Sequence, residues 1–77
     1  MQSIETLYRN TKLYKKLNSY TACELAEGFG EGEGASEDEI LTAWQYISDK
    51  GLWRSLQGFY GRQVHALIDA GAIAPPK

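Results

Sequence analysis

Four glycines fall within seven residues near the middle of this 77-residue chain, between Gly28 and Gly34. Glycine loses more backbone entropy on ordering than any other residue, so neither a helix nor a strand passes cheaply through such a run. We therefore predict a flexible, acidic, glycine-rich loop over about residues 28–35, with Phe29 buried as an anchor. This loop separates the upstream helices from the downstream ones.

Upstream of the loop, apolar residues recur at the three- and four-residue spacings of an amphipathic helix. Ser3 is the expected N-cap of a first helix that ends near Asn18. Thr21 and Glu24 have the spacing of a capping box, which predicts a short second helix from Thr21 to about Glu27.

Downstream of the loop, Ser36 and Glu39 form a second capping-box pattern, and we expect a helix over residues 36–49 that stops before Gly51. A last helix is expected over residues 52–70. Gly58 and Gly61 inside it indicate either close approach of another helix or a local break. Because no segment alternates as a strand does, the chain is predicted to be all-α. We expect one domain over residues 1–77: a bundle of three to four helices with a C-terminal αα-hairpin and a short proline-containing tail over residues 72–77.

Several classes of protein are excluded by size and composition. One cysteine, Cys23, forms no internal disulfide and supplies one of the four ligands that structural zinc needs. The N-terminus lacks the basic and apolar regions of a secretion signal, and no apolar run approaches the roughly 20 residues of a membrane span. We therefore expect a cytoplasmic protein without cofactor, metal or membrane contact.

Charge is distributed very unevenly along the chain. Residues 1–20 sum to +3, residues 21–39 to −7 and residues 40–77 to +2, which gives the net charge of −2. A net negative charge argues against bulk attraction to nucleic acid. The acidic block is the most distinctive electrostatic feature, and its five central members are Glu31, Glu33, Glu37, Asp38 and Glu39.

The glycine-rich, acidic segment has four possible interpretations, and its residue spacing disfavours the first two. The glycines do not match a phosphate-binding loop, and the acids do not match the spacing of a calcium-binding loop. An acidic surface that docks on a basic, nucleic-acid-binding face of another protein is a sharper hypothesis. The simplest alternative is a solvated loop followed by acids that favour the positive end of the next helix dipole.

The remaining candidate residues are aromatic or basic. The chain has more large aromatics than a core of this size needs, so Trp53 and Tyr60 are predicted to anchor a partner protein. No catalytic residue is assigned, because Cys23 and His65 are separated widely and lack an orienting third group. Residues 36–49 and 52–70 also resemble a helix-turn-helix, in which Arg54 and Arg62 would contact nucleic acid.

Residues 26–71 contain five short motifs: Ala26-Glu27-Gly28-Phe29, Ala43-Trp44-Gln45-Tyr46-Ile47, Asp49-Lys50-Gly51-Leu52, Leu56-Gln57-Gly58-Phe59-Tyr60-Gly61-Arg62 and Leu67-Ile68 with Gly71. Together these motifs resemble a family of short bacteriophage-encoded accessory proteins. The sequence departs from the family pattern at Ile47, where leucine is usual, and at Lys50, where threonine is usual. The resemblance implies a phage origin and no specific activity.

Small acidic phage proteins commonly bind and redirect a host protein, and by that analogy we expect a non-enzymatic interaction module. It would inhibit or modulate a host protein in the bacterial cytoplasm through the acidic residues and the aromatic anchors. A homodimer would add burial to a small core. The alternative is a small helix-turn-helix-like co-regulator that binds nucleic acid, although direct nucleic-acid binding is disfavoured by the charge.

Overall fold

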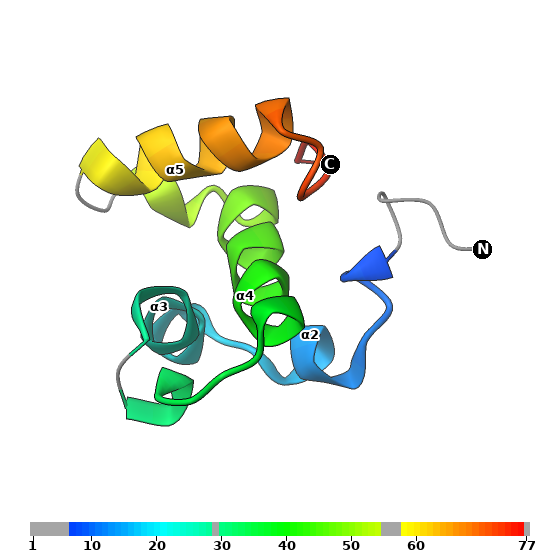
Figure 1. Ribbon diagram of the computed structural model, residues 1–77, viewed down its shortest axis with the longest axis vertical. Helices are drawn as coiled ribbons and strands as arrows, with labels where there is room; N and C mark the ends of the chain where they lie inside the picture. Colours follow the sequence, from blue (N-terminus) through cyan, green and yellow to red (C-terminus); the bar gives the residue numbers. More distant parts are fainter. Residues whose placement is uncertain (1–6, 29, 55–57, 77) are drawn as a thin grey trace.

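The structure, a computed structural model, describes residues 7–28, 30–54 and 58–76, and every regular element in this part is a helix or a 3₁₀ turn. No strand occurs among these residues, which confirms the all-α class (Figure 1). The elements are α2 (Lys12–Lys16), α3 (Ser19–Glu27), the 3₁₀ turn η1 (Gly30–Gly32), α4 (Glu37–Asp49), the 3₁₀ turn η2 (Leu52–Arg54) and α5 (Gly58–Asp69).

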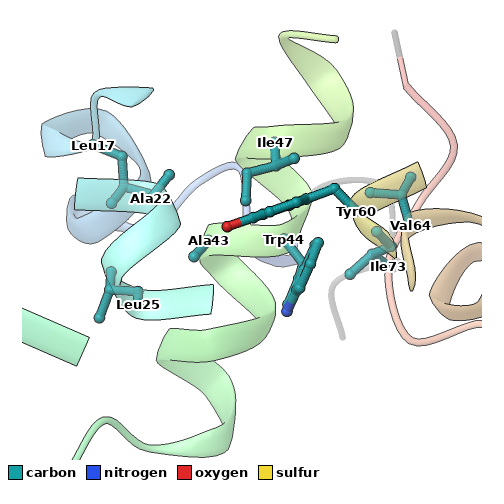
Figure 2. Packing of buried hydrophobic residues seen from close by; sticks show 9 residues of the cluster. All are labelled: Leu17, Ala22, Leu25, Ala43, Trp44, Ile47, Tyr60, Val64 and Ile73. Atoms are coloured by element: carbon teal, nitrogen blue, oxygen red, sulfur yellow. The ribbon is translucent and has the colours of Figure 1, made fainter. Parts of the chain in front are cut away.

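Helix α4 is the central element of the molecule. Helices α2 and α3 lie beside it, and α5 crosses over its C-terminal end (Figure 1). The rings of Trp44 and Tyr60 meet with centroids 5.5 Å apart and join α4 to α5. Figure 2 shows the buried cluster that these helices share: Leu17, Ala22, Leu25, Ala43, Trp44, Ile47, Tyr60, Val64 and Ile73.

The start of α4 confirms its predicted capping box. The Ser36 hydroxyl accepts a hydrogen bond from the Glu39 N–H at 3.2 Å, and the Glu39 carboxylate accepts one from the Ser36 N–H at 2.9 Å. The end is confirmed as well, because α4 stops at Asp49 and Gly51 follows with a φ of 67°. Both features depend on residues within one helical turn of each other, which is why the sequence predicts them.

The upstream helices differ from the prediction. Ser3 lies outside the described residues, and residues 8–11 form a turn, so the single helix expected to end near Asn18 is wrong in this stretch. Thr11 caps the short helix α2, and Asn18 caps α3. Thr21 pairs with Asn18 in this capping box, so α3 begins at Ser19 and the predicted pairing of Thr21 with Glu24 is wrong.

The glycine-rich segment contains the turn η1, which packs against the end of α3 (Figure 1). A Cβ built on Gly32 would lie 2.7 Å from the Leu25 Cα and would overlap the Glu24 carbonyl group. Only glycine permits this backbone approach, so Gly32 is needed for packing. The prediction for Phe29 lies outside the described residues.

The C-terminal helix is shorter than expected. Leu52 belongs to the separate turn η2, and α5 begins at Gly58. The tail turns back after α5, where the Ala72 N–H donates to the Leu67 carbonyl at 2.9 Å. Ile73 and Ala74 are buried. The tail is therefore part of the core.

Candidate functional site

A polar cluster surrounds Asp49 at the C-terminal end of α4. Its carboxylate accepts hydrogen bonds from Arg9 Nε at 2.6 Å and Arg9 Nη2 at 2.5 Å, from the Tyr14 hydroxyl at 2.6 Å and from Gln45 Nε2 at 3.2 Å. The Arg9 and Asp49 side chains are only 8% and 5% exposed. Because four donors occupy the carboxylate, it has no free lone pair directed at a ligand.

The contacts around Asp49 shift the pKa of its carboxyl group and the pKa of the Tyr14 hydroxyl. Burial by itself raises the pKa of Asp49, but hydrogen bonds from Arg9, Tyr14 and Gln45 outweigh it and hold the pKa below its usual value. Burial and the hydrogen bond to Asp49 raise the pKa of Tyr14. Asp49 is thus a fixed anion and Tyr14 a fixed donor, which suits a structural role better than proton transfer.

The same cluster holds the C-terminal tail. The Gln45 side-chain amide accepts from the Ala74 N–H at 2.7 Å and donates to the Ala74 carbonyl at 3.0 Å. Arg9 donates to the Pro75 carbonyl at 2.7 Å. Arg9 and Gln45 therefore join three segments: the turn before α2, helix α4 and the C-terminal tail. The sequence predicted none of these contacts.

The predicted acidic residues lie before and within the first turn of α4. Glu33, Glu37, Asp38 and Glu39 are exposed, whereas the side chain of Glu31 lies outside the described part of the chain. We call these four exposed residues the acidic edge.

The acidic edge keeps most of its charge available. No described member forms an ion pair with a described lysine or arginine within 4.0 Å. Hydrogen bonds from the Ser36 backbone and side chain lower the pKa of Glu39, because its carboxylate belongs to the helix cap. Glu33, Glu37 and Asp38 remain as solvated carboxylates. Burial raises the pKa of Tyr8, and the charges of Asp38 and Glu37 raise it further.

The two predicted aromatic anchors have different environments. Tyr60 is 3% exposed, and its hydroxyl donates a hydrogen bond to the carboxylate of Glu27 at the end of α3. Its predicted role as a surface anchor is wrong, because a partner cannot reach the ring. The adjacent Phe59 is 38% exposed and is the accessible aromatic residue of this pair.

Trp53 lies partly buried on η2, at the opposite end of α4 from the acidic edge (Figure 1). Its ring meets His65 at a centroid distance of 5.2 Å, and the Arg54 guanidinium lies 5.3 Å from the ring centroid. A Cβ on Gly61 would be 3.2 Å from the indole, so the close approach expected at this glycine is made by a ring rather than by a helix. The structure therefore separates Trp53 from the acidic residues with which it was grouped.

The other candidate residues are also placed apart. Arg54 and Arg62 are exposed on η2 and α5. Cys23 is partly buried against the core, and the ring of His65 contacts the ring of Trp53. Among the described residues, no three histidine, cysteine, aspartate or glutamate side chains are grouped as metal ligands.

Comparisons with known proteins add no assignment to this geometry. No protein-family model, curated protein or solved structure matches the chain. None of the described helices has the length and apolar character that crossing a membrane requires. Function is therefore inferred from the surfaces that the fold presents.

Proposed function

We propose that this protein is a non-enzymatic interaction module that docks its acidic edge on a basic surface of a host protein and thereby inhibits or modulates it. The observation that carries the proposal is the group of solvated carboxylates on Glu33, Glu37 and Asp38, none of which is paired with a described cation. Carboxylates held at one end of a packed helix present several negative charges to one face of a partner. Such charge raises the association rate with a basic surface and opposes binding to acidic ones.

The N-terminus of α4 fits this role structurally. The Ser36–Glu39 capping box fixes the first turn, so Glu37 and Asp38 project from a defined backbone rather than from a loose chain. Ordering the acids before binding reduces the entropy lost on association. A basic face that contacts the phosphates of a nucleic acid has suitable charge, and occupation of that face would exclude the nucleic acid.

The test is capture of a tagged protein from bacterial lysate, with and without nuclease, followed by identification of bound proteins by mass spectrometry. We expect a stoichiometric host protein that survives nuclease treatment and is lost from a variant with Glu33→Lys, Glu37→Lys and Asp38→Lys. Glu39 is left unchanged because it caps α4. The variant's circular dichroism must match that of the wild type.

The matched control is Asp69→Lys, which reverses an exposed acid at the far end of α5. Asp38→Lys alone should weaken capture of the host protein, whereas Asp69→Lys should leave it unchanged. Equal capture by the triple variant and the wild type would contradict docking through the acidic edge. Binding lost on nuclease treatment would instead favour nucleic-acid recognition.

The second candidate function is a small nucleic-acid-binding co-regulator. It is supported by Arg54 and Arg62, which are both exposed; the Arg54 guanidinium lies over the partly buried ring of Trp53. Against it, the described residues 50–54, which follow α4 and contain η2, already exceed the three- to four-residue turn that is typical of a helix-turn-helix. Duplex DNA binding that falls steeply with salt and is abolished by Arg54→Ala with Arg62→Ala would support this candidate.

A further inference from the structure

A groove lies between α2 and α3, and none of its lining residues belongs to the acidic edge. Its lining comes from Leu13, Lys16 and Leu17 on one side and from Thr21 and Leu25 on the other. The groove is open to solvent, and its volume is about 110 Å³. The groove forms because the chain turns sharply between α2 and α3, where Asn18 caps the second helix.

The groove has an apolar floor. Leu17 and Leu25 belong to the central buried cluster, so the packing of α3 against α4 fixes their positions (Figure 2). Leu13 is partly buried against the same cluster. A floor that is already ordered loses little entropy when an apolar group is placed on it.

The rim of the groove is cationic. Lys16 lines it, and Lys12 and Lys15 are exposed on the same short helix. None of the three lysines forms an ion pair within 4.0 Å with a described carboxylate, and no acidic residue of the described part lines the groove. An occupant must therefore combine apolar surface for the leucines with negative charge for the lysines.

The volume limits the size of the apolar part. A cavity of about 150 Å³ holds a benzene molecule, so about 110 Å³ suits one aliphatic side chain and is too small for a long alkyl chain. We propose that the α2–α3 groove is a docking site for an acidic peptide segment of a partner protein, with one aliphatic anchor side chain inserted between Leu13 and Leu25. Flanking carboxylates of that segment contact Lys16 and its neighbours.

This site does not depend on the acidic edge, and it selects the opposite charge. The acidic edge attracts a basic surface, whereas the groove attracts an acidic segment. Two sites of opposite preference let one small chain bridge two partners, or two regions of one partner.

The test is titration of the full-length ¹⁵N-labelled protein with a short synthetic peptide that has one central leucine flanked by glutamates, followed by NMR. We expect saturable shifts at Leu13, Thr21 and Leu25. A peptide with serine in place of leucine should bind at least about tenfold more weakly, because it cannot fill the apolar floor. Lys16→Glu should weaken binding of the leucine peptide at least about tenfold.

Lys50→Glu is the matched control, since Lys50 is exposed beside the Tyr46 ring at the end of α4 and outside the groove. It makes the same charge change and should leave affinity within about twofold. The proposal is overturned if the leucine and serine peptides bind equally, if Lys50→Glu weakens binding as much as Lys16→Glu, or if millimolar peptide shifts no groove residue. Tighter binding of decanoate than of the leucine peptide would assign the groove to a fatty acid instead. Each result is independent of capture through the acidic edge, so the two proposals fail separately.

Discussion

At the scale of single residues, Asp49 is the most constrained side chain in the described part of the protein. It is buried, ionised and hydrogen-bonded to Arg9, Tyr14 and Gln45. Removing one partner of such a buried pair leaves an uncompensated charge, which costs far more than the intact pair contributes. The cluster therefore makes stability sensitive to one carboxylate.

We predict that Asp49→Asn lowers the free energy of unfolding at pH 7 by about 3 kcal/mol. The folded-state pKa of Asp49 lies below its ordinary value of 3.8, so the carboxylate stabilises the fold above that pH and loses this effect as the pH falls through the folded pKa. The difference between variant and wild type should shrink accordingly. Urea unfolding at several pH values measures it.

Asp69→Asn is the control for this prediction, because Asp69 is exposed. Its effect should stay within about 0.5 kcal/mol at all pH values. If Asp49→Asn and Asp69→Asn lower the free energy of unfolding equally, the hydrogen bonds to Asp49 do not stabilise the fold as predicted.

At the level of helices and turns, the two glycines of α5, Gly58 and Gly61, differ in whether a side chain packs against them. Gly61 lies under the indole of Trp53, with 3.2 Å between a built Cβ and the Cε3 atom. Among the described residues, a Cβ built on Gly58 would meet only the flexible end of Arg62, at 3.6 Å. The packing of η2 on α5 therefore depends on Gly61 and not on Gly58.

We predict that Gly61→Leu destabilises the fold by about 1–3 kcal/mol through overpacking, while Gly58→Leu changes stability by less than about 0.5 kcal/mol. Chemical unfolding gives both values. Tryptophan fluorescence should shift for Gly61→Leu because the Trp53 ring must move. Equal effects of the two substitutions would contradict the packing of the indole on Gly61.

At the scale of the whole molecule, the C-terminal tail connects regions that are far apart in sequence. Ile73 is 1% exposed within the core, and the Gln45 amide forms two hydrogen bonds with Ala74. The Cα radius of gyration of 11.2 Å agrees with the roughly 11–12 Å of a compact chain of this length. The tail is thus one of the surfaces on which the small core depends.

We predict that a chain truncated after residue 72 loses its cooperative thermal transition. Truncation removes the buried Ile73 side chain, worth about 1.5–3 kcal/mol, and leaves the Gln45 amide unpaired at a cost of about 1–3 kcal/mol. That total is comparable with the whole stability of about 4–12 kcal/mol expected at this size. Circular dichroism during heating measures the transition.

The exposed Pro76 provides the control, and Pro76→Ala should melt within a few degrees of the wild type. A cooperative transition retained by the truncated chain would show that the tail is dispensable.

The sequence does not predict which of the neighbouring residues Phe59 and Tyr60 is buried. Phe59 and Tyr60 both fit beside the apolar stripe of α5, and periodicity does not decide which of them is buried. The structure buries Tyr60 against Trp44 and Glu27 and exposes Phe59. The choice depends on neighbours more than 10 residues away, which no local pattern encodes.

The sequence likewise does not predict which residue pairs with Thr21 in the capping box of α3. Thr21 has a possible partner on each side, Asn18 before it and Glu24 after it. Both spacings obey the capping rule, and the observed helix uses Asn18. Glu24 is buried beside η1, and its carboxylate occupies the place that a Cβ on Gly30 would take. Because this packing holds its side chain, Glu24 does not form a capping box with Thr21.

Local residue patterns are enough to predict the helical class, the position of the glycine-rich segment, the start and end of α4 and the acids of its first turn. These depend on interactions within about one helical turn, which residue spacing records directly. Tertiary structure alone decided the break at Asn18, the burial of Tyr60, the pairing of Arg9 with Asp49 across 40 residues and the docking of the tail. Burial and ion pairing depend on which distant surfaces meet, and that is settled only when the helices pack.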